Sequence, residues 1–199
     1  MKKIFIIGGM GAGKSTARRA LVDQGLPVID LDQVGHDVLT WDVVKDDLIG
    51  AFGLSILDPN GSVDRPALAR KAFASPAMTR KLNRIMMPRI EDAYTREIEE
   101  LEAKGTKAVV VEYSVFKNRA MSLAYSADVV IAVLAPIDLR IQRAVAAGWD
   151  EKDVRRRIAQ QITDAERIEQ ADVVFNNDGT PDELRNKVLA WWEDYSKDL

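Results

Sequence analysis

The chain has 199 residues, 47% hydrophobic and 30% charged, which is enough material for one good hydrophobic core. Its formal net charge of -3 argues against a general nucleic-acid binder, because such proteins carry a strong basic excess. The chain has no cysteine and a single histidine, His36, which excludes disulfides, thiolate metal sites and multi-histidine metal sites.

The N-terminus reads Met-Lys-Lys before an apolar run, but this run ends at Ile7 in a glycine turn and is too short for a signal peptide. No later apolar stretch approaches the roughly 18 residues that a membrane span requires. We therefore expect a cytoplasmic protein whose partners include neither a membrane nor a nucleic acid.

Short apolar runs that end in turn residues predict buried strands, and they alternate along the chain with helical patterns. Strands are expected at residues 4–7, 28–29, 108–111, 129–134 and 173–175. Helices are expected at residues 14–24, at 33–40, through most of 45–104 and from 181 onwards. This alternation predicts an α/β fold with a doubly wound parallel sheet.

Residues 8–15 match the complete P-loop pattern G-x-x-x-x-G-K-[ST] between an expected strand and an expected helix. The glycines allow backbone N–H groups to face phosphate oxygens, and the helix N-terminus adds a positive dipole. Lys14 is expected to act on the β- and γ-phosphates, and the Ser15 hydroxyl to hold Mg²⁺. The residues expected to bind ATP here are Gly8, Gly9, Gly11, Ala12, Gly13, Lys14, Ser15 and Thr16.

Two aspartates, Asp30 and Asp32, lie at the end of the second expected strand, where ligand sites gather in parallel sheets. Asp32, the further out, is the candidate to orient or accept the proton of an attacking hydroxyl group. Both aspartates could instead cap the helix expected from about Gln33, and this reading is favoured for Asp30.

An ordered series of motifs over nearly the whole chain resembles the dephospho-coenzyme A kinase family. The resemblance implies one P-loop kinase domain over residues 1–199, with a helical substrate-binding insertion at 45–104 and a lid region at 143–163. The motifs that carry it are Gly8-Gly9, Asp30-Leu31-Asp32, His36-Asp37-Val38-Leu39, Phe52-Gly53, Asp64-Arg65, Lys81-Leu82-Asn83, Gln161, Arg167, Ala171-Asp172 and Asn177 with Gly179.

The resemblance implies that ATP, with Mg²⁺, phosphorylates the 3′-hydroxyl of dephospho-coenzyme A. Asp32 then matches the family's catalytic aspartate, and Arg143 its lid arginine that meets the transferring phosphate. Asn177 belongs to the expected ATP-binding set. The candidates for meeting substrate phosphates in the insertion, each of which could instead be a solvated surface charge, are Arg65, Lys81 and Arg84.

The lid departs from the family pattern, because Ala147 and Gly148 replace its second arginine and the acidic residue after it. We hypothesise that Arg155 or Arg156 supplies the missing charge, the alternative being an exposed helical face. The loop at 112–117 also departs, and Glu112 is a candidate for the displaced carboxylate there. Two other functions stay open, a kinase for another small molecule such as a nucleoside monophosphate, and a non-catalytic ATP-binding regulator.

Overall fold

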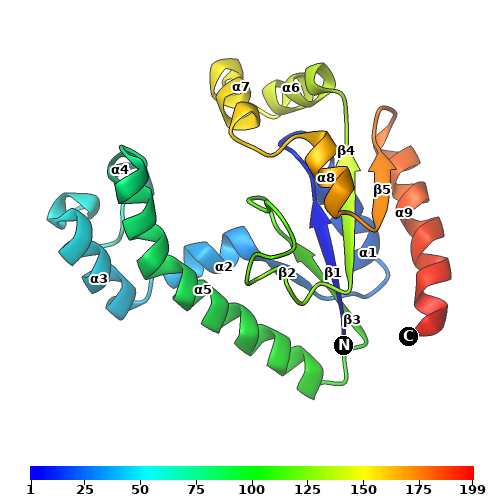
Figure 1. The fold of residues 1–199 in the computed structure, drawn as a ribbon, viewed down its shortest axis with the longest axis horizontal. Coiled ribbons are helices and arrows are strands. Elements are labelled where there is room, and N and C mark those ends of the chain that lie inside the picture. The colour runs from blue at the N-terminus through cyan, green and yellow to red at the C-terminus, as the bar shows by residue number, and fades with distance from the viewer. The chain divides into compact units, whose positions relative to one another are not determined.

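The structure, a computed structural model, describes residues 1–199 and contains one five-stranded parallel sheet (Figure 1). The strand order is β2-β3-β1-β4-β5, so the N-terminal strand lies at the centre, paired with β3 and β4. The strands are β1 (Lys2–Ile7), β2 (Val28–Asp30), β3 (Ala108–Glu112), β4 (Val129–Leu134) and β5 (Val173–Asn176). The predicted parallel α/β sheet is confirmed.

Nine α-helices and two short 3₁₀ helices connect or follow the strands. Up to β3 they are α1 (Lys14–Val22), α2 (Leu31–Val38), α3 (Asp42–Phe52), η1 (Leu54–Ile56), α4 (Arg65–Ala72) and α5 (Pro76–Ala103). After β4 they are α6 (Ile137–Ala146), α7 (Glu151–Ala159), α8 (Asp164–Gln170), α9 (Pro181–Tyr195) and η2 (Ser196–Asp198). None of these helices is both long and apolar enough to cross a membrane.

The chain divides into two compact units. The first comprises residues 1–30 and 100–199, and it holds the sheet with α1 and α6 to α9. The second comprises residues 31–99, and it holds α2, α3, α4 and most of α5. The second unit therefore begins before residue 45, where the insertion was expected, because α2 already belongs to it.

The core of the first unit lies between the sheet and the helices α1 and α9. Alternate strand residues such as Ile4 and Ile131 meet Leu21 of α1 and Val188 of α9 there, and α9 runs alongside β5 (Figure 1). Each such side chain, once fully buried, stabilises the fold by about 1.5–3 kcal/mol. Strand residues of the opposite parity, such as Phe5, are equally inaccessible, which explains why the strands read as continuous apolar runs.

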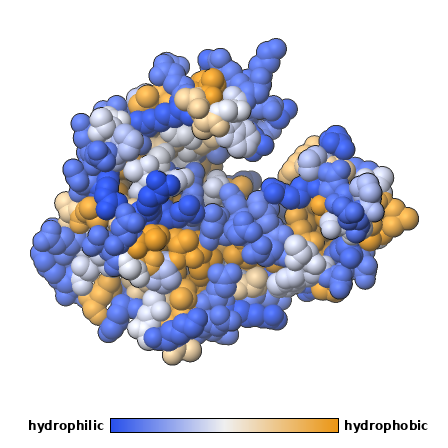
Figure 2. Space-filling view, turned by 180° about the vertical axis from the view of Figure 1, so that it is seen from behind, coloured by the Kyte–Doolittle hydropathy of each residue, from blue (hydrophilic) through white to orange (hydrophobic).

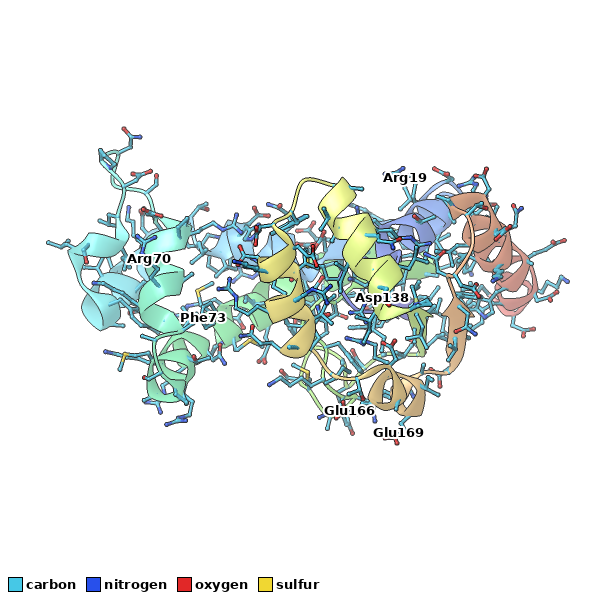
Figure 3. All side chains as sticks on the ribbon, turned by 90° about the horizontal axis from the view of Figure 1, so that it is seen from above. Arg19, Arg70, Phe73, Asp138, Glu166 and Glu169 are labelled. Carbon is cyan, nitrogen blue, oxygen red and sulfur yellow. The ribbon has the colours of Figure 1, made fainter.

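Two of the helices that follow β4 in the first unit begin at a definite local signal. Both α8 and α9 begin with a capping box, in which a threonine and the glutamate three residues later hydrogen-bond each other's backbone N–H. Helices α6 and α7 pack against each other, and Figure 3 shows them side by side, with Asp138 labelled on α6. The lid region expected at 143–163 covers the end of α6, all of α7 and the connection from α7 to α8.

The second unit is mainly helical, with a tight turn between η1 and α4. The Asp58 side chain accepts hydrogen bonds from the backbone N–H groups of Asn60 and Ser62, at 2.8 and 2.9 Å. Asp64 caps α4 by accepting from the N–H of Ala67. Asp58 and Asp64 therefore both have structural roles. Figure 2 shows one face of the whole molecule. Hydrophilic residues cover most of this face, with apolar groups between them.

Candidate active site

The P-loop joins β1 to α1 through a backbone that only glycine adopts without strain. Gly11 and Gly13 have φ values of 74° and 107°, in the left-handed region that L side chains rarely occupy. Gly13 is the N-cap of α1, and no side chain caps that helix end. The positive end of the α1 dipole is thus presented to the loop, as an anion-binding turn requires.

The loop is also closely surrounded by other parts of the first unit. A Cβ atom added to Gly8 would lie 2.5 Å from the Val133 carbonyl oxygen of β4. One added to Gly11 would lie 2.3 Å from the carbonyl oxygen of Arg140 in α6. Real Cβ atoms do not approach backbone so closely, so both positions require glycine for space, and Gly11 requires it for conformation as well.

Lys14, Ser15 and Thr16 form the first turn of α1, as predicted. The Lys14 ammonium donates to the carbonyl oxygen of Gly8 at 3.1 Å, so it lies over the loop that it helps to close. An ammonium held in this place is available to phosphate oxygens bound by the same loop.

Asn177, which follows β5, is hydrogen-bonded to the P-loop backbone. Its side-chain Nδ2 donates to the Ala12 carbonyl oxygen at 2.8 Å, and its own N–H donates to Leu134 at 2.7 Å. The residue is only 5% exposed, and its buried Oδ1 accepts no hydrogen bond. Asn177 therefore links the P-loop to the loop after β5. This places it next to the expected ATP-binding residues, and its own contact with ATP stays a prediction.

Arg143 of α6 also reaches the loop after β5. Its guanidinium donates to the carbonyl oxygens of Asn177 and Gly179, both at 3.0 Å. The expected contact with the transferring phosphate stays a prediction. Helix α6 ends at Ala146, and Gly148 turns the chain with a φ of 92°, so the altered lid residues lie at the end of this helix.

The three consecutive arginines of α7 are held by their own helical region. Arg155 pairs with Glu151 at 2.8 Å and Arg156 with Asp153 at 2.8 Å, while Arg157 lies over the Trp149 ring, 4.9 Å from its centroid. All three are exposed. The structure thus places them on a solvated helical face, which is the alternative to the hypothesis that Arg155 or Arg156 supplies the missing lid charge.

Arg140 is a candidate that sequence reasoning missed. It is only 3% exposed, and its Nε donates to the carbonyl oxygen of Met10 in the P-loop at 2.9 Å. Burial lowers the pKa of its guanidinium, and the nearby Asp164 opposes this shift. The available signal was its position three residues before Arg143, which places both arginines on one face of α6.

Carboxylates gather at the C-terminal ends of β2 and β3, which are neighbours in the sheet. Asp30 and Glu112 are paired in the strand register, and Arg18 of α1 lies 3.1 Å from an oxygen of each. Asp30 is therefore the last residue of a strand and takes part in an ion pair. Asp32 lies in the first turn of α2, where its charge suits the helix dipole; α2 begins at Leu31 rather than near Gln33.

The structure separates the three expected phosphate-binding cations of the second unit. Lys81 and Arg84 line one open hollow of about 420 Å³, next to Arg89 and Asp47. Lys81 there donates to the Ala51 carbonyl oxygen at 2.9 Å. The hollow has three cations and one acid among its lining residues, so it suits an anionic group.

Arg65, the first residue of α4, lines a different hollow of about 190 Å³. His36 and Lys45 line the same hollow. The sequence placed Arg65 with Lys81 and Arg84 in a single substrate-binding set, whereas within this unit they belong to two hollows.

The parallel sheet of order β2-β3-β1-β4-β5, the complete P-loop after its central strand and the helices that follow β4 define a P-loop kinase. Residues 3–183 match a family model described as dephospho-CoA kinase. The chain belongs to the dephospho-CoA kinase family.

Relatives at the sequence level extend over nearly the whole chain. A dephospho-CoA kinase of Corynebacterium efficiens is 40% identical over 187 residues, covering 93% of this chain and 92% of that one. One of Thermobifida fusca is 33% identical, covering 100% of this chain and 98% of its own. The likeness to these relatives therefore extends over nearly the full length of each chain.

Solved structures support the fold. TT1252 from Thermus thermophilus has a TM-score of 0.83 and 26% identity, covering 97% of each chain. A dephospho-CoA kinase from Campylobacter jejuni has a TM-score of 0.75 at 21% identity, covering 100% of this chain and 99% of that one. At this identity the second comparison shows a shared fold.

Proposed function

We propose that this chain transfers the γ-phosphate of ATP to the 3′-hydroxyl of dephospho-coenzyme A, the last step of coenzyme A biosynthesis. The observation that carries the proposal is the complete P-loop, with Lys14 folded over Gly8, in a chain of this family. We also propose a cytoplasmic location, with a small-molecule substrate and neither nucleic acid nor membrane as a partner.

The donor half of the reaction depends on positive charge arranged around the phosphates. Phosphoryl transfer proceeds through a loose transition state, so positioning and electrostatic stabilisation contribute nearly all of the catalysis. Lys14, the loop N–H groups and the α1 dipole supply that charge from the first unit. Arg143 is the proposed additional cation from α6.

Magnesium fits the oxygen donors at this site. Ser15 offers a hydroxyl in the first turn of α1, and no group of three or more acidic or histidine side chains is arranged as a metal cage. Mg²⁺ prefers few protein ligands, with phosphate oxygens and water completing an octahedral shell. When bound, it would neutralise charge on the β- and γ-phosphates.

The acceptor half is assigned to the second unit. We propose that Asp32 orients the 3′-hydroxyl and accepts its proton, and that Arg65, Lys81 and Arg84 bind the substrate's phosphates. The cation-lined hollow around Lys81 and Arg84 supports the latter role, and the position of Asp32 just beyond the end of β2 supports the former.

The two other functions are less well supported than this one. A nucleoside monophosphate kinase or an ATP-binding regulator would also carry the P-loop. The relatives that match nearly the full length, however, are named dephospho-CoA kinase.

One assay with a matched pair of variants tests the proposal. Purified protein with ATP, Mg²⁺ and dephospho-coenzyme A should form ADP and coenzyme A, whereas nucleoside monophosphates should not replace the acceptor. We expect Asp32→Asn to lower kcat by about 10²- to 10⁴-fold, as loss of a general base does.

The control is Asp30→Asn, which removes a carboxylate two residues away that pairs with Arg18. It should lower kcat far less than Asp32→Asn. Equal losses in the two variants would contradict the role of Asp32, and ADP formation with no transfer to dephospho-coenzyme A would contradict the proposed function.

A further inference from the structure

Met10 in the P-loop is hydrogen-bonded on both sides by side chains from distant parts of the first unit. Its N–H donates to Oε1 of Gln161 at 3.0 Å. Its carbonyl oxygen accepts from Nε of Arg140 at 2.9 Å. Both backbone polar groups of one loop residue are thus held by α6 and by the connection between α7 and α8.

The two side chains that hold Met10 also hold each other. Nη2 of Arg140 donates to the same Oε1 of Gln161 at 3.2 Å. Met10, Gln161 and Arg140 therefore form a closed ring of three hydrogen bonds. The guanidinium is planar with its donors in fixed directions, so its bond to Gln161 also sets the direction of its bond to Met10.

Neighbouring charges hold Arg140 in place. Asp164, the first residue of α8, lies 3.5 Å from Nη1 of Arg140 and 2.6 Å from Arg167. The capping box of Thr163 and Glu166 fixes where α8 begins, and so where Asp164 lies. A buried guanidinium is costly unless it is paired and hydrogen-bonded, and here each of its three nitrogens has a partner.

The loop has little freedom to move relative to this ring. A Cβ on Gly9 would lie 1.8 Å from Nη2 of Arg140, and one on Gly11 would lie 2.3 Å from the Arg140 carbonyl oxygen. The loop backbone therefore lies closely against Arg140, and moving away would break the bonds to Met10. Phosphate-binding loops act through the directions of their N–H groups, and a displacement of about 1 Å can cost roughly 10²-fold in rate.

We propose that Arg140 and Gln161 are positioning residues for phosphoryl transfer, which clamp the P-loop at Met10 in the shape that receives the ATP phosphates. The proposal rests on the proposed function for the overall reaction, but its first consequence is for ATP binding alone. Without the clamp, the loop must be ordered when ATP binds, so part of the binding free energy is lost.

The test compares Gln161→Met with Gln160→Met, its matched control. Methionine is similar in length to glutamine but lacks the strong acceptor that the ring needs. Gln160 lies next along the chain at the C-terminal end of α7, and its side chain is exposed. We expect Gln161→Met to raise the dissociation constant for Mg-ATP about tenfold, as loss of one net hydrogen bond does, and Gln160→Met to leave it unchanged.

Steady-state kinetics add a measurement that a merely structural role would not change. The KM for ATP should rise and kcat should fall in Gln161→Met, whereas the KM for dephospho-coenzyme A should stay near that of the wild type. Arg140→Lys is the second variant, because it keeps the positive charge but loses the planar guanidinium with its several donors in fixed directions. It should show the same direction of change.

The proposal is overturned if Gln161→Met binds Mg-ATP as the wild type does, whatever its melting temperature. It is equally overturned if this variant binds ATP more tightly, because Gln161 would then compete with phosphate for the Met10 N–H. Wild-type protein that binds ATP but does not phosphorylate dephospho-coenzyme A contradicts the proposed function alone, since the binding comparison stays valid.

Discussion

Helices α6 and α7 are neighbours, and both carry arginines. The α6 arginines contact loops elsewhere in the first unit, whereas the α7 arginines contact only residues of α7 or just before it. The α6 arginines, Arg140 and Arg143, donate to backbone carbonyl oxygens of the P-loop and of the loop after β5. The α7 arginines pair with acids of their own helix or lie over Trp149. Three consecutive residues point about 100° apart on a helix, whereas residues three apart share one face.

In this protein the two arginines at helical spacing contact the loops of the candidate site, whereas the run of three is held within its own helical region. The side chains of α6 also close a triangle with Asn177. Arg140 contacts the P-loop, Arg143 contacts the loop after β5, and Asn177 joins these two loops through Ala12. These three contacts join α6, the P-loop and the loop after β5 to one another. Together they restrict relative movements of these segments that one contact alone would allow.

Lys14→Ala should lower the rate of phosphoryl transfer more than any other variant of the first unit. The losses in the arginine variants can be compared with this one. We expect transfer to fall by roughly 10²-fold or more, because one charge directed at the transferring group is lost. Single-turnover kinetics measures the loss, and circular dichroism should show an intact fold. Turnover near that of the wild type would refute the P-loop assignment.

Arg143→Ala should have an intermediate effect. A hydrogen bond from a charged group contributes about 1.5–3 kcal/mol; if the equivalent of one such bond is lost in the transition state, kcat/KM for ATP should fall by roughly 10- to 10²-fold. Arg143→Lys keeps the positive charge but loses the two guanidinium nitrogens that donate to separate carbonyl oxygens. Its kcat/KM for ATP should lie between that of Arg143→Ala and that of the wild type. A loss in kcat alone would favour contact with the transferring phosphate, whereas a loss in ATP affinity alone would favour bracing of the loop after β5. No loss in either would contradict both.

Arg155→Ala and Arg156→Ala should have the smallest effects. Exposed ion pairs within a helix contribute about 0.3–0.5 kcal/mol, so kcat and KM should stay within about twofold of the wild type. Arg157→Ala is the comparison on the same helix, since its partner is an aromatic ring. A tenfold loss of kcat in Arg155→Ala or Arg156→Ala alone would restore the hypothesis of a substitute lid arginine.

Local patterns predicted much of the fold correctly. β4 runs from Val129 to Leu134 and α9 begins at Pro181, both as expected from apolar runs and a proline start. The second helix was placed too late, because it begins at Leu31, directly after the strand. Glycine and proline mark such boundaries, and the segment from Val28 to Gln33 contains neither.

The candidate site was predicted in part. The P-loop residues lie together because they are adjacent in the chain and their motif fixes the local backbone. Arg140 was missed because its partners, Met10 and Gln161, are 130 and 21 residues away in sequence. Its spacing from Arg143 places it on the same helix face, but that spacing does not show which loop the face meets.

The sequence by itself determined the parallel α/β class, the phosphate-binding loop and the family, because each depends on residue order within short segments. Only the tertiary structure decided which arginines face the nucleotide loops, that Asp30 pairs with Arg18, and that Arg65 lines a different hollow from Lys81 and Arg84. These outcomes depend on how helices pack and turn relative to one another within each unit. That packing is set by many long-range contacts at once, so no single segment of the sequence determines it.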